Sequence, residues 1–130
     1  MIELYPTKCN ICGGKVEYTS NAKIYGRQYG SGYCYLCKEC GAFVGTHKPR
    51  PRQAMGILAD AKMRDLRMQC HELFDSIWRN NKHPVAKRRK TYAWLAEKLD
   101  IPVYECHFGY MDRDMLNKAL NILKADKEQE

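Results

Sequence analysis

Residues 33–47 read YCYLCKECGAFVGTH, and this stretch contains three cysteines, Cys34, Cys37 and Cys40, spaced three residues apart. Two overlapping C-x-x-C pairs are therefore possible. Only the pair that ends at Cys40 is followed by a glycine, Gly41, and the same C-x-x-C-G pattern occurs in CNICGG, residues 9–14. The repeated pattern selects Cys37 and Cys40 as the paired cysteines. Cys34 is then assigned to packing within a strand, where its side chain alternates with those of its neighbours.

The two C-x-x-C-G motifs predict one structural zinc ion. Zinc in such sites is held by four thiolates in a tetrahedron, and each tight C-x-x-C turn supplies two of them. A glycine after the second cysteine allows a left-handed turn and lets backbone amides point at the sulfurs. Redox or disulfide use is the alternative, but an odd total of seven cysteines argues against a disulfide framework. The predicted zinc ligands are Cys9, Cys12, Cys37 and Cys40.

The predicted fold class is α+β, with an N-terminal zinc ribbon of short antiparallel strands packed with about three C-terminal helices. The 24 residues between the cysteine pairs, residues 13–36, are enough for a β-hairpin. Apolar residues at helical spacing then form three groups: Leu66, Cys70, Leu73, Phe74 and Ile77; Tyr92, Leu95 and Leu99; and Leu116, Leu120 and Leu123 after a cap at Asp112. The predicted ranges are 1–47 for the ribbon, 48–53 for a basic linker, 54–125 for a helical region forming one compact unit with the ribbon, and 126–130 for a frayed tail.

Positive charge is concentrated in the middle of the chain. The 130 residues carry 22 basic and 15 acidic side chains, net +7, while residues 46–90 alone carry twelve and four, net +8. Such a segment suits a phosphate backbone or an acidic protein surface, and a solvated lysine and arginine face is the plainer alternative. The chain shows neither a secretory signal nor an apolar run long enough to span a bilayer, so we expect a cytoplasmic protein without membrane contacts.

Nine residues are candidates for nucleic-acid contact. Arginine suits bidentate contacts to phosphates, and tyrosines beside an arginine in a loop can stack on unpaired bases. The alternative for the tyrosines is packing across the hairpin. The candidates are Arg27 and Tyr29 in a glycine-rich loop, Lys48, Arg50 and Arg52 in the linker, and Lys87, Arg88, Arg89 and Lys90 near the start of a helix.

Three polar side chains are weak candidates for catalysis: His71, Asp75 and His107. His71 and Asp75 are four residues apart on one expected helix, so Asp75 is able to orient His71 as a base. A solvated face with an ordinary ion pair is the alternative. The dipeptides Cys70-His71 and Cys106-His107 also suggest the hypothesis of a second metal site. Cys70, however, lies on the apolar face of the expected helix and is expected in the core.

Four motifs cover most of the chain: CNICGGKVEYTSNAKIYG (9–26), YGSGYCYLCKECGAFVGTH (29–47), GILADAKMRDLRMQCHELFDSIW (56–78) and YAWLAEKLDIPVYECHFGYMD (92–112). In this order they resemble a family of small zinc-finger-containing proteins typical of bacteriophages and their bacterial hosts. The resemblance implies a zinc site at the four paired cysteines and one unit made of ribbon and helices. It also draws attention to His47, His71, Asp75, Trp78 and His107, but it implies no mechanism.

Three functions follow as hypotheses from these features. The leading one is a phage-type accessory protein that binds nucleic acid through a basic surface, and the second is an adaptor or inhibitor that binds a host or phage enzyme. The third is a nuclease-like enzyme that uses the two histidines and the aspartate. The sequence distinguishes neither DNA from RNA nor single from double strands, and it does not define an oligomeric state.

Overall fold

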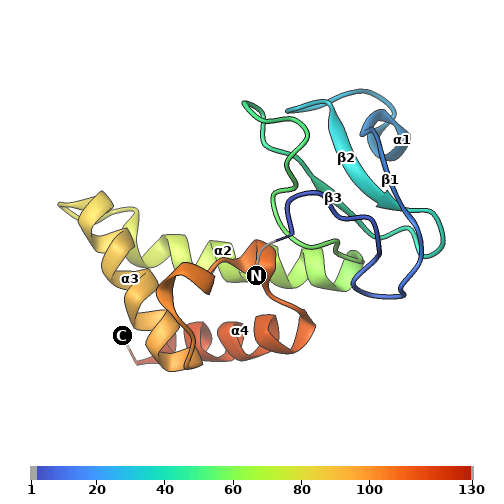
Figure 1. Cartoon of the computed structure of the whole chain (residues 1–130). Coiled ribbons are helices and arrows are strands. Elements are labelled where there is room, and N and C mark those ends of the chain that lie inside the picture. The colour runs from blue at the N-terminus through green and yellow to red at the C-terminus, as the bar shows by residue number, and fades with distance from the viewer. Residues whose placement is uncertain (1–2, 130) are drawn as a thin grey trace. The chain divides into compact units, whose positions relative to one another are not determined.

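The computed structural model describes residues 3–129 of the chain (Figure 1). It consists of two compact units, Met1–Ala61 and Lys62–Glu130. The first unit contains a small antiparallel sheet and the four paired cysteines, and the second contains three long helices. The fold class is therefore α+β, as predicted. No helix within residues 3–129 combines the length and the apolar character that a membrane span requires.

The sheet of the first unit has three strands in the order β1-β2-β3, all antiparallel. Tyr35 lies at its centre, paired with Tyr18 on one side and with Val44 on the other. A short helix that the sequence did not predict follows the first strand. The elements are β1 (Val16–Ser20), α1 (Ala22–Tyr25), β2 (Tyr33–Cys37) and β3 (Phe43–Gly45).

Residues 54–60 belong to the ribbon unit, so the predicted start of the helical region at residue 54 is wrong. Ala54 bridges to Thr46, and Ala59 bridges to Phe43 through two backbone hydrogen bonds of 2.9 and 3.2 Å. Ala54, Leu58 and Ala59 are fully buried. The segment bends between its two bridges and is not helical, because its amides pair with residues of and next to β3.

The basic segment 48–53 forms a closed loop rather than an open linker. The amide of His47 donates to the carbonyl of Gln53 at 3.1 Å, next to the bridge between Thr46 and Ala54. Two tyrosine hydroxyls hold the loop from the sheet: Tyr18 donates to the carbonyl of Pro51, and Tyr35 donates to that of Arg52. The chain turns at Pro51 and Arg52 and then returns to the ribbon.

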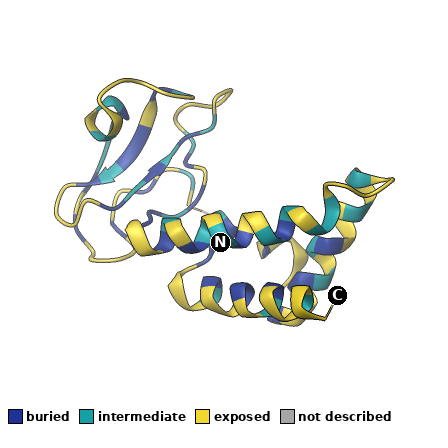
Figure 2. Cartoon of the chain, turned by 180° about the vertical axis from the view of Figure 1, so that it is seen from behind, coloured by how far each residue is buried: buried dark blue, intermediate teal, exposed yellow. Residues whose placement is uncertain are grey.

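The second unit contains the three helices that the apolar spacing predicted. They are α2 (Ala61–Trp78), α3 (Pro84–Leu99) and α4 (Arg113–Glu128), with 3-10 turns η1 (Val103–Glu105) and η2 (Phe108–Tyr110) before α4. The predicted positions Leu66, Cys70 and Phe74 are buried, whereas Leu73 and Ile77 are half-buried at the edge of the face. Figure 2 shows the corresponding change between buried and exposed positions along these helices.

The ends of the helices follow local rules. Pro84 begins α3, where its missing amide costs no helical hydrogen bond. Asp112 caps α4 as predicted, with its carboxylate accepting from the amide of Met115 at 2.9 Å. This last helix continues to Glu128, so residues 126–128 are helical rather than frayed, and Glu130 lies outside the described residues. That ribbon and helices form a single unit stays a prediction.

Candidate metal centre

Two turns of nearly identical geometry present the four paired cysteines. The amide of Gly13 donates to the carbonyl of Cys9, and that of Gly41 donates to Cys37 in the same way. Both glycines have positive φ, 78° and 82°, which side chains rarely adopt, so each glycine is required where its turn reverses. The trailing glycine of the C-x-x-C-G motif therefore has the predicted role.

The sulfurs of Cys9, Cys12, Cys37 and Cys40 all lie within 4.8 Å of one another. Two pairs of sulfurs join the two turns at 3.7 Å, between Cys9 and Cys40, and at 3.5 Å, between Cys12 and Cys37. In a tetrahedral site with Zn–S bonds of about 2.3 Å, neighbouring sulfurs are about 3.8 Å apart. The four side chains therefore fit one structural zinc ion, and the closed set of thiolates leaves no position for a substrate.

Backbone amides surround the sulfurs and stabilise their negative charge. The amides of Ile11, Gly14 and Cys40 point at sulfurs of the cluster at 3.3–3.4 Å. The amide of Cys40 lowers the pKa of the Cys37 thiol to about 6. The amide of Ala42 favours the thiolate of Cys40. Desolvation and the sulfurs of Cys12 and Cys37 outweigh this contact and raise the pKa of Cys40 to about 12. Four thiolates at this spacing need a cation to compensate their charge.

Two further residues of the first turn, Asn10 and Gly14, support the centre, and neither was among the predicted site residues. A Cβ at Gly14 would lie 2.9 Å from the end of the flexible Glu39 side chain and 3.1 Å from the sulfur of Cys37, so any larger residue requires the Cys37 side of the centre to shift by a few tenths of an ångström. The side-chain amide of Asn10 exchanges two hydrogen bonds with the backbone of Leu58, at 3.0 and 2.9 Å. The double glycine of CNICGG was a sequence signal for Gly14. Nothing in the sequence pairs Asn10 with a residue 48 positions away.

The other three cysteines lie apart from this centre and are buried. Cys34 is 1% exposed on β2, which confirms its assignment to strand packing. Burial raises the pKa of both Cys70 and Cys106 to about 11. Within residues 3–129 the four ligands are the one cluster of three or more histidine, cysteine or acidic side chains that could hold a metal. The dipeptides Cys70-His71 and Cys106-His107 thus form no second centre of that kind.

A three-stranded sheet with two cysteine turns around one metal position defines the class of structural zinc-finger proteins. Consistent with this class, the model of a family described as a zinc-finger-containing domain matches residues 5–126, and the chain belongs to that family. Searches of curated proteins and of solved structures returned no match.

The polar residues singled out as weak catalytic candidates have other contacts. The Asp75 carboxylate accepts from the indole N–H of Trp78 at 2.9 Å and from Arg79 at 3.1 Å. His71 lies edge-on to the ring of Phe108, with 4.8 Å between centroids, and desolvation lowers its pKa. No side-chain hydrogen bond joins Asp75 to His71 in the described chain; as i and i+4 residues of α2 they share only the backbone bond of the helix.

Two histidines have contacts that do not depend on a metal. The ring of His107 lies 5.9 Å from the rings of Tyr92 and Tyr110. His47 is half-buried, and its backbone closes the basic loop through Gln53 and Arg50. The backbone of His47 therefore contributes to closing this loop.

The candidate nucleic-acid residues divide between the two units. In the ribbon unit, the guanidinium of Arg27 lies 4.8 Å from the centroid of the Tyr29 ring, and that of Arg52 lies 5.0 Å from Tyr18. In the helical unit, Arg88 lies against Tyr92 and Trp78, at 4.9 and 5.7 Å. The remaining candidates are exposed or half-buried: Lys48, Arg50, Lys87, Arg89 and Lys90.

Proposed function

We propose that the protein binds nucleic acid through the basic surface of its zinc ribbon, defined as Arg27, Lys48, Arg50 and Arg52. The observation that carries this proposal is the fixed basic loop. Three of these four side chains stand on a loop whose two ends are bridged and whose carbonyls accept from Tyr18 and Tyr35. Cations held in place lose less entropy on binding phosphates than cations on a mobile chain.

The charges of this surface are not neutralised within the ribbon. All four side chains are exposed. Among the described ribbon residues, the ion pair is between Lys23 and Glu17, at 2.7 Å. It involves none of the four residues of the basic surface. Arg50 instead donates to the neutral amide of Gln53 at 2.9 Å. Exposed cations without carboxylate partners are available to phosphate oxygens.

The basic residues of α3 support the proposal less directly, because they are spread around the helix. Lys87 and Lys90 line one hollow with Trp94, whereas Arg89 lines another with His83. Consecutive residues of a helix point about 100° apart, so the run KRRK does not form one stripe. We assign it an accessory role in phosphate contact.

The test is the salt dependence of binding by the zinc-loaded protein. Single-stranded and duplex DNA and RNA are titrated over a range of salt concentrations. Replacing Arg50 and Arg52 by glutamine is expected to reduce the slope of log affinity against log salt by about 1.4 to 1.8, from 0.7 to 0.9 per phosphate. The matched control changes Lys118 and Lys124 to glutamine, which removes the same charge from exposed positions of α4. Failure to bind any of the four nucleic acids at low salt would overturn the proposal.

A protein partner is the second candidate function. Four apolar side chains of the helical unit are more than half exposed: Met68 69%, Val85 73%, Val103 52% and Tyr104 71%. Exposed apolar side chains favour protein contact when they gather on one surface. Recovery of one partner at a fixed stoichiometry, unchanged by nuclease treatment and lost on Val85→Asp or Tyr104→Asp, would support this alternative.

A further inference from the structure

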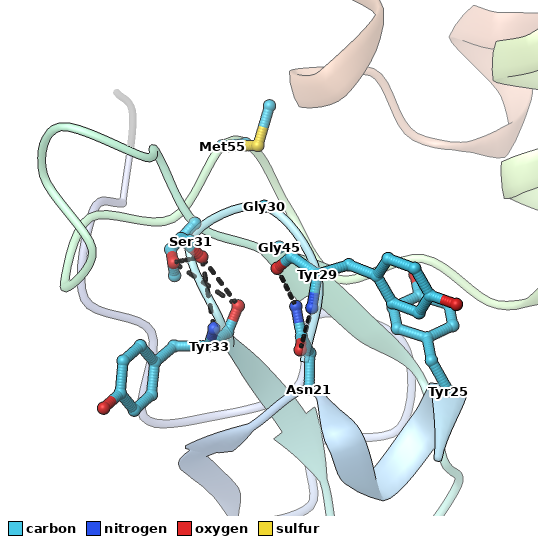
Figure 3. A pocket seen from close by; sticks show the side chains of 9 residues that line it. Asn21, Tyr25, Tyr29, Gly30, Ser31, Tyr33, Gly45 and Met55 are labelled. Atoms are coloured by element: carbon cyan, nitrogen blue, oxygen red, sulfur yellow. Dashed lines mark hydrogen bonds between the residues drawn. The ribbon is translucent and has the colours of Figure 1, made fainter. Parts of the chain in front are cut away.

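We infer that a tyrosine-walled pocket beside the basic surface accepts one unpaired nucleobase, so that single strands are the preferred ligands. The inference rests on the proposed nucleic-acid function and specifies which form of nucleic acid is bound. The pocket, called the tyrosine pocket below, has a volume of about 510 Å³. Figure 3 shows its lining, to which Tyr25, Tyr29, Ser31, Gly45 and Met55 contribute.

The walls of the tyrosine pocket are aromatic and apolar. The rings of Tyr25 and Tyr29 meet edge to face, with centroids 5.5 Å apart. Tyr25 is 52% exposed, Tyr29 48% and Met55 53%, so the pocket opens to solvent. Although this contact and the Arg27 guanidinium cover part of the rings, about half of each tyrosine stays exposed to a further planar group. Nucleobases stack well on such rings because every base has a π-face.

The pocket is held in shape before any ligand binds. Asn21, which is only 7% exposed, binds the backbone of Tyr29 twice: its amide donates to the carbonyl at 2.8 Å, and its oxygen accepts from the amide at 3.1 Å. The hydroxyls of Ser31 and the buried Thr46 lie 2.6 Å apart and fix the other side. A preformed pocket binds with little loss of conformational entropy.

Charge complementarity favours a nucleotide over a neutral aromatic ligand. The guanidinium of Arg27 lies over the ring of Tyr29, and its Nε donates to the Tyr29 hydroxyl at 2.8 Å. This places a cation at the edge of the pocket, where the phosphate of a stacked nucleotide is expected. A base within a duplex has both faces covered by its neighbours, so only an unpaired base offers a face to the tyrosines.

The experiment compares three fluorescent DNA ligands of one length: a thymine strand, the same strand with abasic sites, and a duplex. The double variant Tyr25→Ala/Tyr29→Ala is expected to bind the thymine strand about five- to hundredfold more weakly, the loss of one base stack. Its affinity for the duplex and the abasic strand is expected to remain unchanged. The matched control is Tyr104→Ala, which removes a tyrosine that is 71% exposed in the helical unit.

A second variant tests the pocket without removing its tyrosines. A Cβ added at Gly45 would meet only the sulfur of Met55, at 3.8 Å, so Gly45→Leu extends into the pocket. It is expected to reproduce the loss for the thymine strand while zinc content and circular dichroism stay at wild-type values. Tyr29→Phe keeps the ring under the Arg27 guanidinium and loses only the hydroxyl that accepts from Arg27, so it is expected to weaken binding of the thymine strand less than the double alanine variant.

The outcomes separate the two proposals. Absence of binding to all three ligands overturns the nucleic-acid function itself. Equal affinity for the thymine and abasic strands, unchanged by the tyrosine variants and by Gly45→Leu, overturns the base pocket and leaves phosphate binding in place. The base pocket is also overturned if these substitutions abolish binding of a protein partner and leave binding of the thymine strand unchanged. The pocket would then bind an aromatic side chain of that partner.

Discussion

Tyr18 holds the basic loop through both its ring and its hydroxyl. The guanidinium carbon of Arg52 lies 5.0 Å from the centroid of the Tyr18 ring, and the hydroxyl donates to the carbonyl of Pro51 at 2.8 Å. The same ring stacks on Tyr33, with centroids 5.2 Å apart and planes at 12°. A side chain of β1 thus fixes both the backbone and one cation of the loop.

Removing the Tyr18 hydroxyl is expected to loosen this loop without unfolding the ribbon. Tyr18→Phe keeps the ring and loses one hydrogen bond, a change of about 1 kcal/mol. Hydrogen exchange of the His47, Arg50 and Gln53 amides is expected to accelerate, with zinc retained. The control is Tyr25→Phe, since the Tyr25 hydroxyl makes no hydrogen bond among residues 3–129. Unchanged exchange in the first variant would contradict this role of Tyr18.

Zinc removal is expected to divide the seven cysteines into two classes. The ribbon unit has a small core whose buried residues include two of the ligands, Cys9 and Cys37, so it depends on the metal for folding. Chelation followed by iodoacetamide should alkylate the four ligands and Cys34 quickly. Cys70 and Cys106 should react slowly, because burial raises the pKa of both thiols to about 11 and keeps them protonated.

Mass spectrometry of the alkylated peptides checks this division. In the zinc-loaded control, all seven cysteines are expected to be alkylated slowly. In the denatured control, all seven are expected to be alkylated quickly. Alkylation of Cys70 at the rate of Cys34 after chelation would show that the helical unit also requires zinc.

Gly14→Ala is expected to weaken zinc binding sharply. Its Cβ would lie 2.9 Å from the end of the flexible Glu39 side chain and 3.1 Å from the sulfur of Cys37, so that sulfur must shift by a few tenths of an ångström from its place in the cluster. Crowding of this kind costs about 1–3 kcal/mol, equivalent to about five- to hundredfold in affinity. Competition with a chromogenic chelator measures the change. Gly45→Ala is the matched control, because its Cβ meets an ordinary contact at 3.8 Å, and equal affinities for the two variants would refute the explanation.

Asp75→Ala is expected to destabilise the helical unit rather than abolish a reaction. Asp75 accepts from the indole of Trp78 and from Arg79, so its loss leaves the indole N–H without its partner. The cost is about 1–2 kcal/mol, at the lower end because Trp78 is only half-buried. Thermal unfolding measures it against Glu72→Ala, an exposed carboxylate on the same helix. Equal stability of the two variants would remove the structural role assigned to Asp75.

The zinc ligands and the long helices could be predicted from sequence because both depend on local patterns. Each cysteine turn is defined within six residues, and the buried face of α2 follows from apolar spacing along one helix. The features that could not be predicted are pairings between distant residues. Ala59 is hydrogen-bonded to Phe43, and Asn10 is hydrogen-bonded to Leu58. No local sequence pattern indicates either contact.

Composition also misled where several conformations suit the same residues. Residues 54–60 contain alanine and leucine, which favour a helix, yet bridges to Thr46 and Phe43 hold them in a bent, non-helical path. Similarly, the run from Lys87 to Lys90 looks like one basic cluster in the sequence. On the helix, Arg88 turns toward Trp78 and Tyr92, while Lys87 and Lys90 face Trp94.

The return of the chain to the ribbon after the basic loop determines where the protein can be divided. A fragment that stops at residue 47, after the last cysteine turn and strand, would retain all four zinc ligands. It would lack the backbone that Asn10 binds, the edge that pairs with Phe43 and the buried Leu58. The smallest piece able to behave as an autonomous finger therefore extends through Ala59, and excision at the cysteine motifs alone would yield a metal-binding peptide with an unfinished core.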